Sequence, residues 1–183
     1  MSSYNNESKE RNIGTKEIAL SGLLLSVAFI CSNIKLAQMP MGGSVTMLSM
    51  VFISLIGYLF GVKIGLISAL AYGFLQLSFG GYVMHPLQML FDYPIAFMCL
   101  GFSGIFRNKT HGLRNGYMLG CLCKYLCHVF TGVVFFSETG APLISSITYS
   151  LTYNAYILPE VVITVLLIPV LLPYINKHKI TLN

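Results

Sequence analysis

Long apolar runs separated by short polar or charged stretches dominate the pattern of this chain. A hydrocarbon core about 30 Å thick is crossed by roughly 20 apolar residues in helical conformation. The runs that approach this length cover residues 17–37, 45–60, 63–80, 86–106, 116–137 and 147–174. The pattern therefore predicts an all-α integral membrane protein, a bundle of six transmembrane helices.

The boundary between the second and third runs rests on few residues. Only Gly61, Val62 and Lys63 separate the two runs, so they could also form one long helix. A charge and two glycines between residues 60 and 65 disfavour a continuous helix. We expect a tight turn between two helices here.

Composition supports the membrane assignment. Hydrophobic residues make up 55% of the 183 residues, charged residues 9%, and the mean hydropathy is +0.74, whereas soluble domains carry about 25% charged residues. Six spans use most of the chain, so we expect no separate catalytic domain and no enzyme activity. We expect an N-terminal tail over residues 1–15, a transmembrane domain over 16–176 and a C-terminal tail over 177–183.

Basic residues indicate the orientation, because cytoplasmic loops of membrane proteins are enriched in Lys and Arg. We predict that both termini, and hence both tails, are cytoplasmic, because all basic residues except Lys35 and Lys124 then lie on the cytoplasmic side. These residues are Lys9, Arg11, Lys16, Lys63, Arg107, Lys109, Arg114, Lys177 and Lys179. The net charge of +5 thus indicates contact with anionic lipid and gives no support for nucleic-acid binding.

Two ionisable side chains, Lys124 and His128, lie one helical turn apart in the fifth apolar run. A lysine in the bilayer interior costs about 2.5–3.5 kcal/mol even on mild insertion scales, so such a group usually faces a cavity and marks a ligand or ion path. The alternative is a structural pair satisfied by neighbouring helices. Gly132, one turn further on, would leave room for a ligand beside the backbone.

The cysteines near these residues do not suit a metal site. Cys121 and Cys123 point about 200° apart on a continuous helix, so they cannot join Cys127 and His128 around one tetrahedral metal. The five cysteines lie in or beside apolar runs, as small buried hydrophobic residues do. We predict no metal site and no cofactor.

Small residues recur every four positions at Gly61, Gly65, Ala69 and Gly73. Such a row lets another helix approach closely. Two interpretations stay open: packing within the bundle, or a docking face for another membrane protein.

Polar and aromatic residues gather toward the outer end of the predicted bundle, in residues 38–44, 80–86 and 149–154 and at Asp92. One carboxylate, a histidine, an amide and several aromatic rings suit a small, flat, nitrogen-rich cation. A phosphate ligand is disfavoured, because Lys124 is the single basic donor and a glycine-rich phosphate loop is lacking. Lys124 could also pair with Asp92, and spacing does not decide between these roles.

Glu160 lies well inside the sixth run, directly after Pro159. We expect the proline to kink the helix. Glu160 is then either a protonatable group tied to motion or a hydrogen-bonded carboxyl that holds the kink, and we leave it out of the binding site.

Five motifs in order resemble the thiamine-specific substrate-binding subunits (S components, ThiT family) of energy-coupling factor transporters. The motifs cover residues 40–46, 80–88, 92–97, 124–132 and 149–160, nearly the whole chain. The resemblance implies a six-helix protein of the prokaryotic plasma membrane that binds thiamine from outside. It also implies a scaffold transmembrane subunit and two cytoplasmic ATPase subunits as partners. The region 16–176 would then be the substrate-binding domain.

By position, the resemblance assigns roles to individual residues. Asp92 is similar to the acidic ligand of the aminopyrimidine, and Phe136 to a residue that stacks on a ring. The remaining members line or close the pocket: Tyr82, Tyr93, Lys124, His128, Tyr149 and Asn154. Because Tyr149 and Asn154 would point about 140° apart on one helix, we expect the sixth helix to begin near or after Tyr149.

The chain departs from the family pattern at three positions. Some members carry Glu at position 92 and Trp at position 136, whereas this chain has Asp92, Phe136 and no Trp; affinity or the preferred thiamine relative could differ. Members also dock the scaffold subunit through an alanine-x-x-x-alanine face, but here Ala19 is followed by Leu23. We therefore predict a docking face formed by Ala19, Gly22 and Ser26.

Two other functions compete with the S component. A stand-alone proton-coupled carrier could use Glu160 or His128, although such carriers commonly contain paired repeats, and this chain shows none. An intramembrane enzyme could use Asp92 and His128, but the sequence offers neither a nucleophile nor a metal set beside them.

Overall fold

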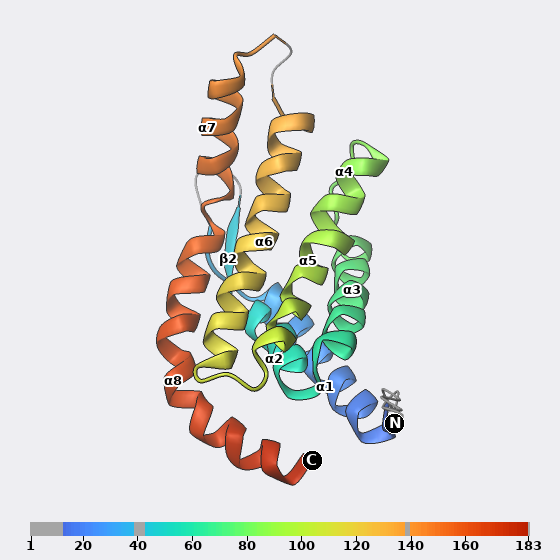
Figure 1. Cartoon of the computed structure of the whole chain (residues 1–183). Helices are drawn as coiled ribbons and strands as arrows, with labels where there is room; N and C mark the ends of the chain where they lie inside the picture. The colour runs from blue at the N-terminus through green and yellow to red at the C-terminus, as the bar shows by residue number, and fades with distance from the viewer. Residues whose placement is uncertain (1–12, 39–42, 138–139, 183) are drawn as a thin grey trace, which may run out of the picture.

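The structure, a computed structural model, describes residues 13–38, 43–137 and 140–182; side chains 176 and 178–182 are excepted. Residues 1–12 of the tail predicted over 1–15, and part of the 40–46 motif, lie outside these ranges. The described chain is an elongated bundle of helices with one small hairpin (Figure 1). α1 begins, and α8 ends, at the same end of the bundle, the lower end in Figure 1.

The elements follow in this order: α1 (Thr15–Asn33), β1 (Lys35–Gln38), β2 (Ser44–Thr46), α2 (Ser49–Phe60), α3 (Val62–Ser78), α4 (Pro86–Leu90), the π-helix η1 (Phe91–Ile95), α5 (Ala96–Met98), the 3₁₀-helix η2 (Cys99–Phe106), α6 (Gly112–Phe135), α7 (Leu143–Asn154) and α8 (Ile157–Leu182). The segment from α4 to η2 runs as one helical rod. α8 extends past the predicted start of the C-terminal tail at residue 177.

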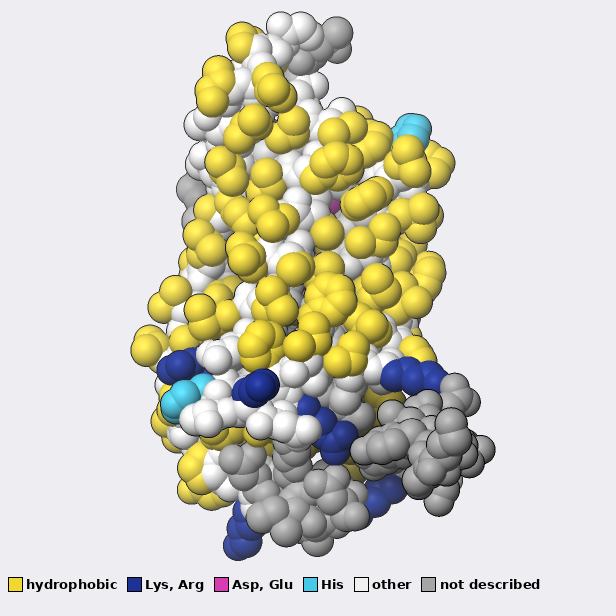
Figure 2. Space-filling model, viewed as in Figure 1, with side chains coloured by type: hydrophobic (Ala, Val, Ile, Leu, Met, Phe, Trp, Pro, Cys, Tyr) yellow, Lys and Arg dark blue, Asp and Glu magenta, His cyan; other side chains and the backbone are white. Residues whose placement is uncertain are grey.

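Four helical segments of the described chain are long and apolar enough to cross a membrane: Thr15–Asn33, Pro86–Phe106, Gly112–Phe135 and Ile157–Ile175. α2 and α3 are apolar but shorter. Apolar side chains cover the upper and middle parts of the surface, and Lys and Arg side chains gather near the lower end (Figure 2). A mostly helical, multi-pass membrane protein is therefore confirmed, whereas the count of six spans and the side of the termini stay predictions.

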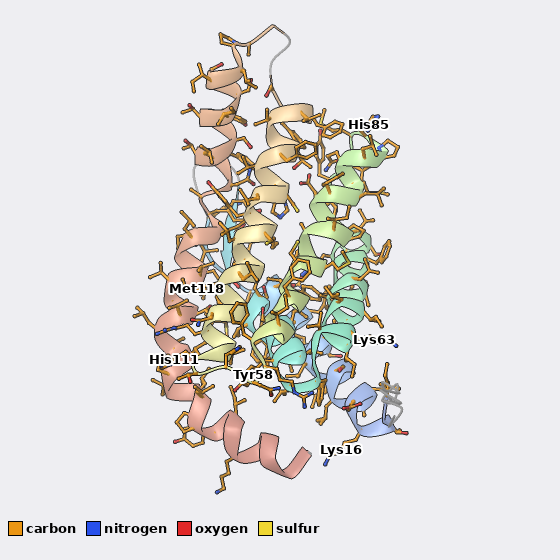
Figure 3. The ribbon with its side chains drawn as sticks, viewed as in Figure 1. Lys16, Tyr58, Lys63, His85, His111 and Met118 are labelled. Atoms are coloured by element: carbon orange, nitrogen blue, oxygen red, sulfur yellow. The ribbon has the colours of Figure 1, made fainter. Side chains whose placement is uncertain are left out.

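The side-chain view gives the same polarity along the bundle axis. Lys16, Lys63 and His111 lie at its lower end, and His85 lies at its upper end (Figure 3). The turn predicted between the second and third runs is confirmed: Gly61 separates α2 from α3 with φ of 96°, a conformation that glycine adopts without a steric penalty.

Two expected boundaries are wrong. The first helix ends at Asn33 rather than near residue 37, because Ile34 turns extended and the next residues pair in an antiparallel hairpin, with Lys35 opposite Thr46. Strand pairing satisfies backbone groups that would otherwise lack partners.

The sixth run is also two helices rather than one. α7 already begins at Leu143, so Tyr149 lies within it, and the chain breaks at Ala155 and Tyr156 before α8. Pro159 falls in the first turn of α8, where the missing N–H removes no helical hydrogen bond. The expected kink at Pro159 is therefore replaced by a break that precedes it.

Glycines bring the helices of the lower half into backbone contact. A Cβ atom on Gly65 would lie 2.6 Å from Cα of Gly57 and 2.9 Å from the carbonyl oxygen of Gly101, and one on Gly73 would lie 2.7 Å from the carbonyl oxygen of Tyr93. Ala69, between them, is fully buried. Of the two interpretations of this small-residue row, packing within the bundle is the one that the structure supports.

We expect Gly65→Ala to destabilise the protein by about 1–3 kcal/mol, the usual range for overpacking. Gly22→Ala is the matched control, because among the described residues nothing lies within 4 Å of a Cβ atom at Gly22 and alanine favours the helix. Thermal unfolding in detergent should show a lower Tm for Gly65→Ala and an equal or higher Tm for Gly22→Ala. Equal Tm values for the two variants would contradict the packing described.

Candidate functional site

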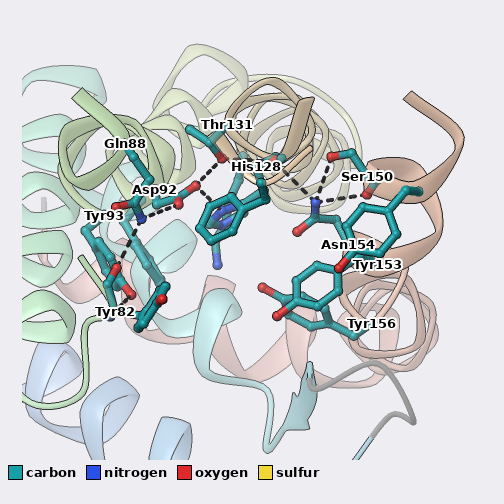
Figure 4. A pocket seen from close by; sticks show the side chains of 15 residues that line it. Tyr82, Gln88, Asp92, Tyr93, His128, Thr131, Ser150, Tyr153, Asn154 and Tyr156 are labelled. Carbon is teal, nitrogen blue, oxygen red and sulfur yellow. Dashed lines mark hydrogen bonds and ion pairs between the residues drawn. The ribbon is translucent and has the colours of Figure 1, made fainter. Parts of the chain in front are cut away.

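A cavity of about 380 Å³ opens in the upper half of the bundle, between the rod α4–η2, α6 and the junction of α7 with α8 (Figure 4). Its volume lies within the range of small-molecule sites. It is lined by Tyr82, Gln88, Asp92, Tyr93, Phe97, Lys124, His128, Thr131, Gly132, Phe136, Tyr149, Ser150, Tyr153, Asn154 and Tyr156. The structure thus brings together all nine residues that the sequence predicted for the binding site.

One row of residues on α6 explains where the cavity begins. Residues four apart lie on one face of a helix, and this row starts with Gly112, Gly116 and Gly120. A Cβ atom on Gly116 would lie 2.6 Å from Cα of Ser103, and one on Gly120 would lie 2.9 Å from Cα of Leu100, so α6 and η2 touch there. The next members of the row are Lys124 and His128, and both line the cavity. The close contact therefore ends where the row changes from glycine to long polar side chains.

Asp92 is placed by a local distortion of its helix. Pro94 has no N–H to donate, so the regular helical bond at that position is lost. The chain widens into the five-residue π-helix η1, in which Ala96 N–H reaches back to the carbonyl oxygen of Phe91. Single π turns of this kind occur often at functional sites.

The carboxylate of Asp92 is held by three donors. Its Oδ1 accepts from His128 Nδ1 at 3.0 Å and from the hydroxyl of Thr131, and its Oδ2 accepts from Gln88 Nε2 at 2.7 Å. Only 13% of the Asp92 side chain and 12% of the His128 side chain are exposed. A buried carboxylate needs such charge-assisted bonds to remain ionised.

The other ring nitrogen of His128, Nε2, is buried and has no hydrogen-bond partner among the described residues. Because a carboxylate only accepts, Nδ1 carries the hydrogen, and Nε2 of the neutral ring is an open acceptor. Buried polar atoms are rarely left unpaired in native proteins. The open nitrogen therefore indicates a position for a ligand donor.

Lys124 does not form the ion pair with Asp92 that the sequence left open. Its ammonium lies 3.9 Å from the sulfur of Met50 and 3.9 Å from the ring centroid of Phe97, and the residue is only 6% exposed. Asp92 already accepts from three other side chains, those of Gln88, His128 and Thr131. Lys124 instead forms a wall shared by the main cavity and a smaller cavity of about 160 Å³.

Glu160 lines the smaller cavity and joins α8 to the start of α2. Its carboxylate accepts from the hydroxyl of Thr46 at 2.6 Å, from that of Ser49 at 3.4 Å and from Met50 N–H at 3.3 Å. A carboxylate is favourable at a helix N-terminus, and Leu48, which precedes α2, supplies no side-chain cap. Glu160 is therefore a structural cap contributed by a distant helix.

Helix α7 closes the cavity from the opposite side. Asn154 Nδ2 donates to the carbonyl oxygens of Ser150 at 2.9 Å and His128 at 3.2 Å. The Ser150 hydroxyl donates to the carbonyl oxygen of Val129 at 2.8 Å. A Cβ atom on Gly132 would overlap the side chain of Ser150. The space at Gly132, which we expected to serve a ligand, is thus largely taken by α7.

Aromatic rings form the mouth of the cavity. The rings of Tyr82 and Phe136 lie 6.3 Å apart, and those of Tyr149 and Tyr153 are stacked at 6.0 Å. Tyr93 accepts a hydrogen bond from Tyr82 N–H at 2.7 Å. The roles expected for Tyr149 and Asn154 do not require a late helix start, since both reach the cavity from within α7.

The sequence analysis missed several cavity residues. Gln88 lies four positions before Asp92 and Thr131 three positions after His128, so helical spacing could have found both. Phe97 lies four positions after Tyr93 and Tyr153 four positions after Tyr149, so the same spacing could have found them. Tyr156 carries no such signal, because it lies in the break between α7 and α8.

The predicted docking residues Ala19, Gly22 and Ser26 lie on an exposed face of α1. The Ser26 hydroxyl donates to the carbonyl oxygen of Gly22 at 2.9 Å. Leu23 beside them is 60% exposed. The described chain therefore leaves this face uncovered.

We expect Gly132→Ala to push α7 away from α6. The free energy of unfolding should fall by about 1–3 kcal/mol, and the Tm should fall with it. Ser150→Gly removes the atoms that the new methyl group would overlap. In a double-mutant cycle monitored by thermal unfolding, the double variant should lose less stability than the sum of the losses of the two single variants. Additive losses would show that Ser150 is not the obstacle.

Comparison with known proteins gives one consistent result. The sequence model of the family described as "Thiamine transporter protein (Thia_YuaJ)" matches residues 18–180. Thiamine transporter ThiT of Bacillus subtilis (strain 168) is 36% identical over 162 residues, covering 80% of this chain and 83% of that protein. Thiamine transporter ThiT of Lacticaseibacillus paracasei is 32% identical over 107 residues, covering 51% and 53%.

A solved structure of ThiT from Listeria monocytogenes has the same fold. It matches with a TM-score of 0.72 at 22% identity and covers 90% of this chain and 97% of its own.

Proposed function

Because the chain belongs to the thiamine transporter protein family Thia_YuaJ, we propose that it is the substrate-binding subunit of an energy-coupling factor transporter and captures thiamine from outside the cell. It is a transport protein of the prokaryotic plasma membrane rather than an enzyme. A scaffold transmembrane subunit and two cytoplasmic ATPase subunits would complete the transporter.

The observation that carries the thiamine proposal is the pair of open acceptors in the cavity, on Asp92 Oδ2 and His128 Nε2. Thiamine contains an aminopyrimidine, whose amino group has two N–H donors, and a positively charged thiazolium ring. The amino group would donate to Asp92 Oδ2, and His128 Nε2 would accept from another donor of the ligand or from a bridging water. The carboxylate and the aromatic rings of the cavity favour the cation.

The shape of the cavity also suits this ligand. Two flat rings could stack against the aromatic side chains that line the cavity, which include Tyr82, Phe136 and Tyr149. Lys124 would sit at the inner end, where it can donate to a ring nitrogen. An anionic ligand is disfavoured, because Asp92 lies beside the same space.

We expect purified protein in detergent to bind thiamine without ATP in isothermal titration calorimetry. Asp92→Asn and His128→Asn should each weaken binding by about 30-fold, because a buried hydrogen bond to a charged group contributes about 1.5–3 kcal/mol. His111→Asn, the same substitution at the lower end, should leave the Kd unchanged. Folded protein that gives no heat with thiamine would refute the proposal.

The chain alone should not transport thiamine. A stand-alone proton-coupled carrier would accumulate thiamine in liposomes that contain only this chain and an imposed pH gradient. We expect no uptake under these conditions, because Glu160 is engaged as a cap of α2 and offers no free carboxylate. Uptake that depends on the gradient would favour the carrier.

The α1 face would dock the scaffold subunit through Ala19, Gly22 and Ser26, since small residues permit close helix contact. We expect Gly22→Leu to retain thiamine binding but to reduce copurification with the scaffold subunit and uptake by the complete transporter. Ser145→Leu is the control, because it places the same side chain at an exposed position of another helix, α7, that does not line the main cavity. Equal uptake by both variants would place docking elsewhere.

A further inference from the structure

A buried amide, Gln88, joins the acidic group of the cavity to the segment at its mouth. Gln88 is 1% exposed and lies in α4, about one helical turn before Asp92. Its Nε2 donates to Asp92 Oδ2 at 2.7 Å and to the carbonyl oxygen of Tyr82 at 3.1 Å, and its Oε1 accepts from Met84 N–H at 3.0 Å. Figure 4 shows Gln88 beside Asp92, with Tyr82 below them.

This network fixes the orientation of the amide. Three of the four hydrogen-bonding positions of a glutamine amide are used here. Turning the amide by 180° would place Oε1 against two acceptors, Asp92 Oδ2 and the carbonyl oxygen of Tyr82. It would also place the NH₂ group against Met84 N–H. Gln88 therefore has one stable arrangement.

The first consequence concerns the carboxylate. Each carboxylate oxygen offers about two acceptor positions. On Asp92, Oδ1 is filled by His128 and Thr131, and Oδ2 is half filled by Gln88. One acceptor position, on Oδ2, is left for a ligand, and Gln88 determines its direction.

The second consequence concerns the mouth. Tyr82 lies outside the helices, in the connection between α3 and α4, and is 64% exposed. Its backbone is held on both sides, by the Tyr93 hydroxyl at its N–H and by Gln88 at its carbonyl oxygen. The Tyr82 ring then faces Phe136 across 6.3 Å. The rod that carries Asp92 thus also places the aromatic mouth.

We propose that Gln88 is a positioning residue that determines specificity: it presents one acceptor position of Asp92 to a single N–H donor of an amino-bearing aromatic cation and holds Tyr82 over the same ligand. The identity of the cation rests on the proposed thiamine function. Without the amide, Asp92 gains a second open position and freedom to turn, so it discriminates less between a ligand donor and a ligand acceptor. Tyr82 loses its support at the same time.

The test compares Gln88→Met with Gln76→Met. Methionine matches glutamine in length but lacks the amide. Gln76 is the control, since its side chain donates to the Tyr72 hydroxyl and does not line the main cavity. Calorimetry would measure the Kd of thiamine and of its 4-oxo analogue, in which a carbonyl replaces the amino group.

We expect Gln88→Met to weaken thiamine binding roughly tenfold, as for loss of one charge-assisted hydrogen bond, and to reduce the preference for thiamine over the oxo analogue by several-fold. Gln76→Met should change neither the Kd nor the preference. An equal loss for both ligands in Gln88→Met would mean a merely structural role and would overturn the proposal. If Gln88→Met does not fold, Gln88→Ala carries the same test, because it also removes both donors and adds no charge beside Asp92.

A ligand-free measurement separates this proposal from that of thiamine binding. The chain has no Trp, so Phe136→Trp introduces one fluorescent indole beside Tyr82. In this background Gln88→Met should increase quenching by acrylamide, and Gln76→Met should not. Increased quenching in a protein that fails to bind thiamine would reject thiamine and support the role of Gln88; unchanged quenching would overturn that role whatever the ligand.

Discussion

The buried carboxylate of Asp92 is the constraint on which the upper half of this protein depends. The charge of Asp92 is stable there because His128, Thr131 and Gln88 donate to it. These donors come from α6 and from the turn that precedes η1, so the same bonds that hold the charge also join two membrane-spanning segments. A bundle that lost the carboxylate would leave three buried donors without their acceptor, at a cost comparable to that of a lost charged pair.

Backbone packing in the lower half creates the space that this charge faces. α6 lies against η2 through Gly116 and Gly120, and α3 lies against η2 through Gly65. Where the α6 row continues as Lys124 and His128, both side chains line the cavity (Figure 4). The cavity is thus a direct result of residue size along one face of one helix. Its rigid floor is the glycine-packed region below it.

The far side of the cavity depends on contacts between segments distant in the sequence. Asn154 and Ser150 bind carbonyl oxygens of α6, and Glu160 caps α2 from α8. The break at Ala155 and Tyr156 lies between these two attachments, so the chain can approach α6 above the break and α2 below it. This arrangement brings Tyr153 and Tyr156 to the ligand space.

The sequence by itself determined the membrane class and singled out Asp92, Lys124 and His128 as candidates for the site, whereas most of the other predicted site residues came from the resemblance to a family. It could do so because burial in lipid demands long apolar runs, and because Asp92, Lys124 and His128 are too costly there without a purpose. Only the tertiary structure decided the partners of these groups. Lys124 turns to Met50 and Phe97 rather than to Asp92, the space at Gly132 belongs to Ser150, and Gln88 connects Asp92 to Tyr82. Hydrogen bonds and close contacts are set by distances of a few ångströms between elements, and helical periodicity fixes only the face of one helix at a time.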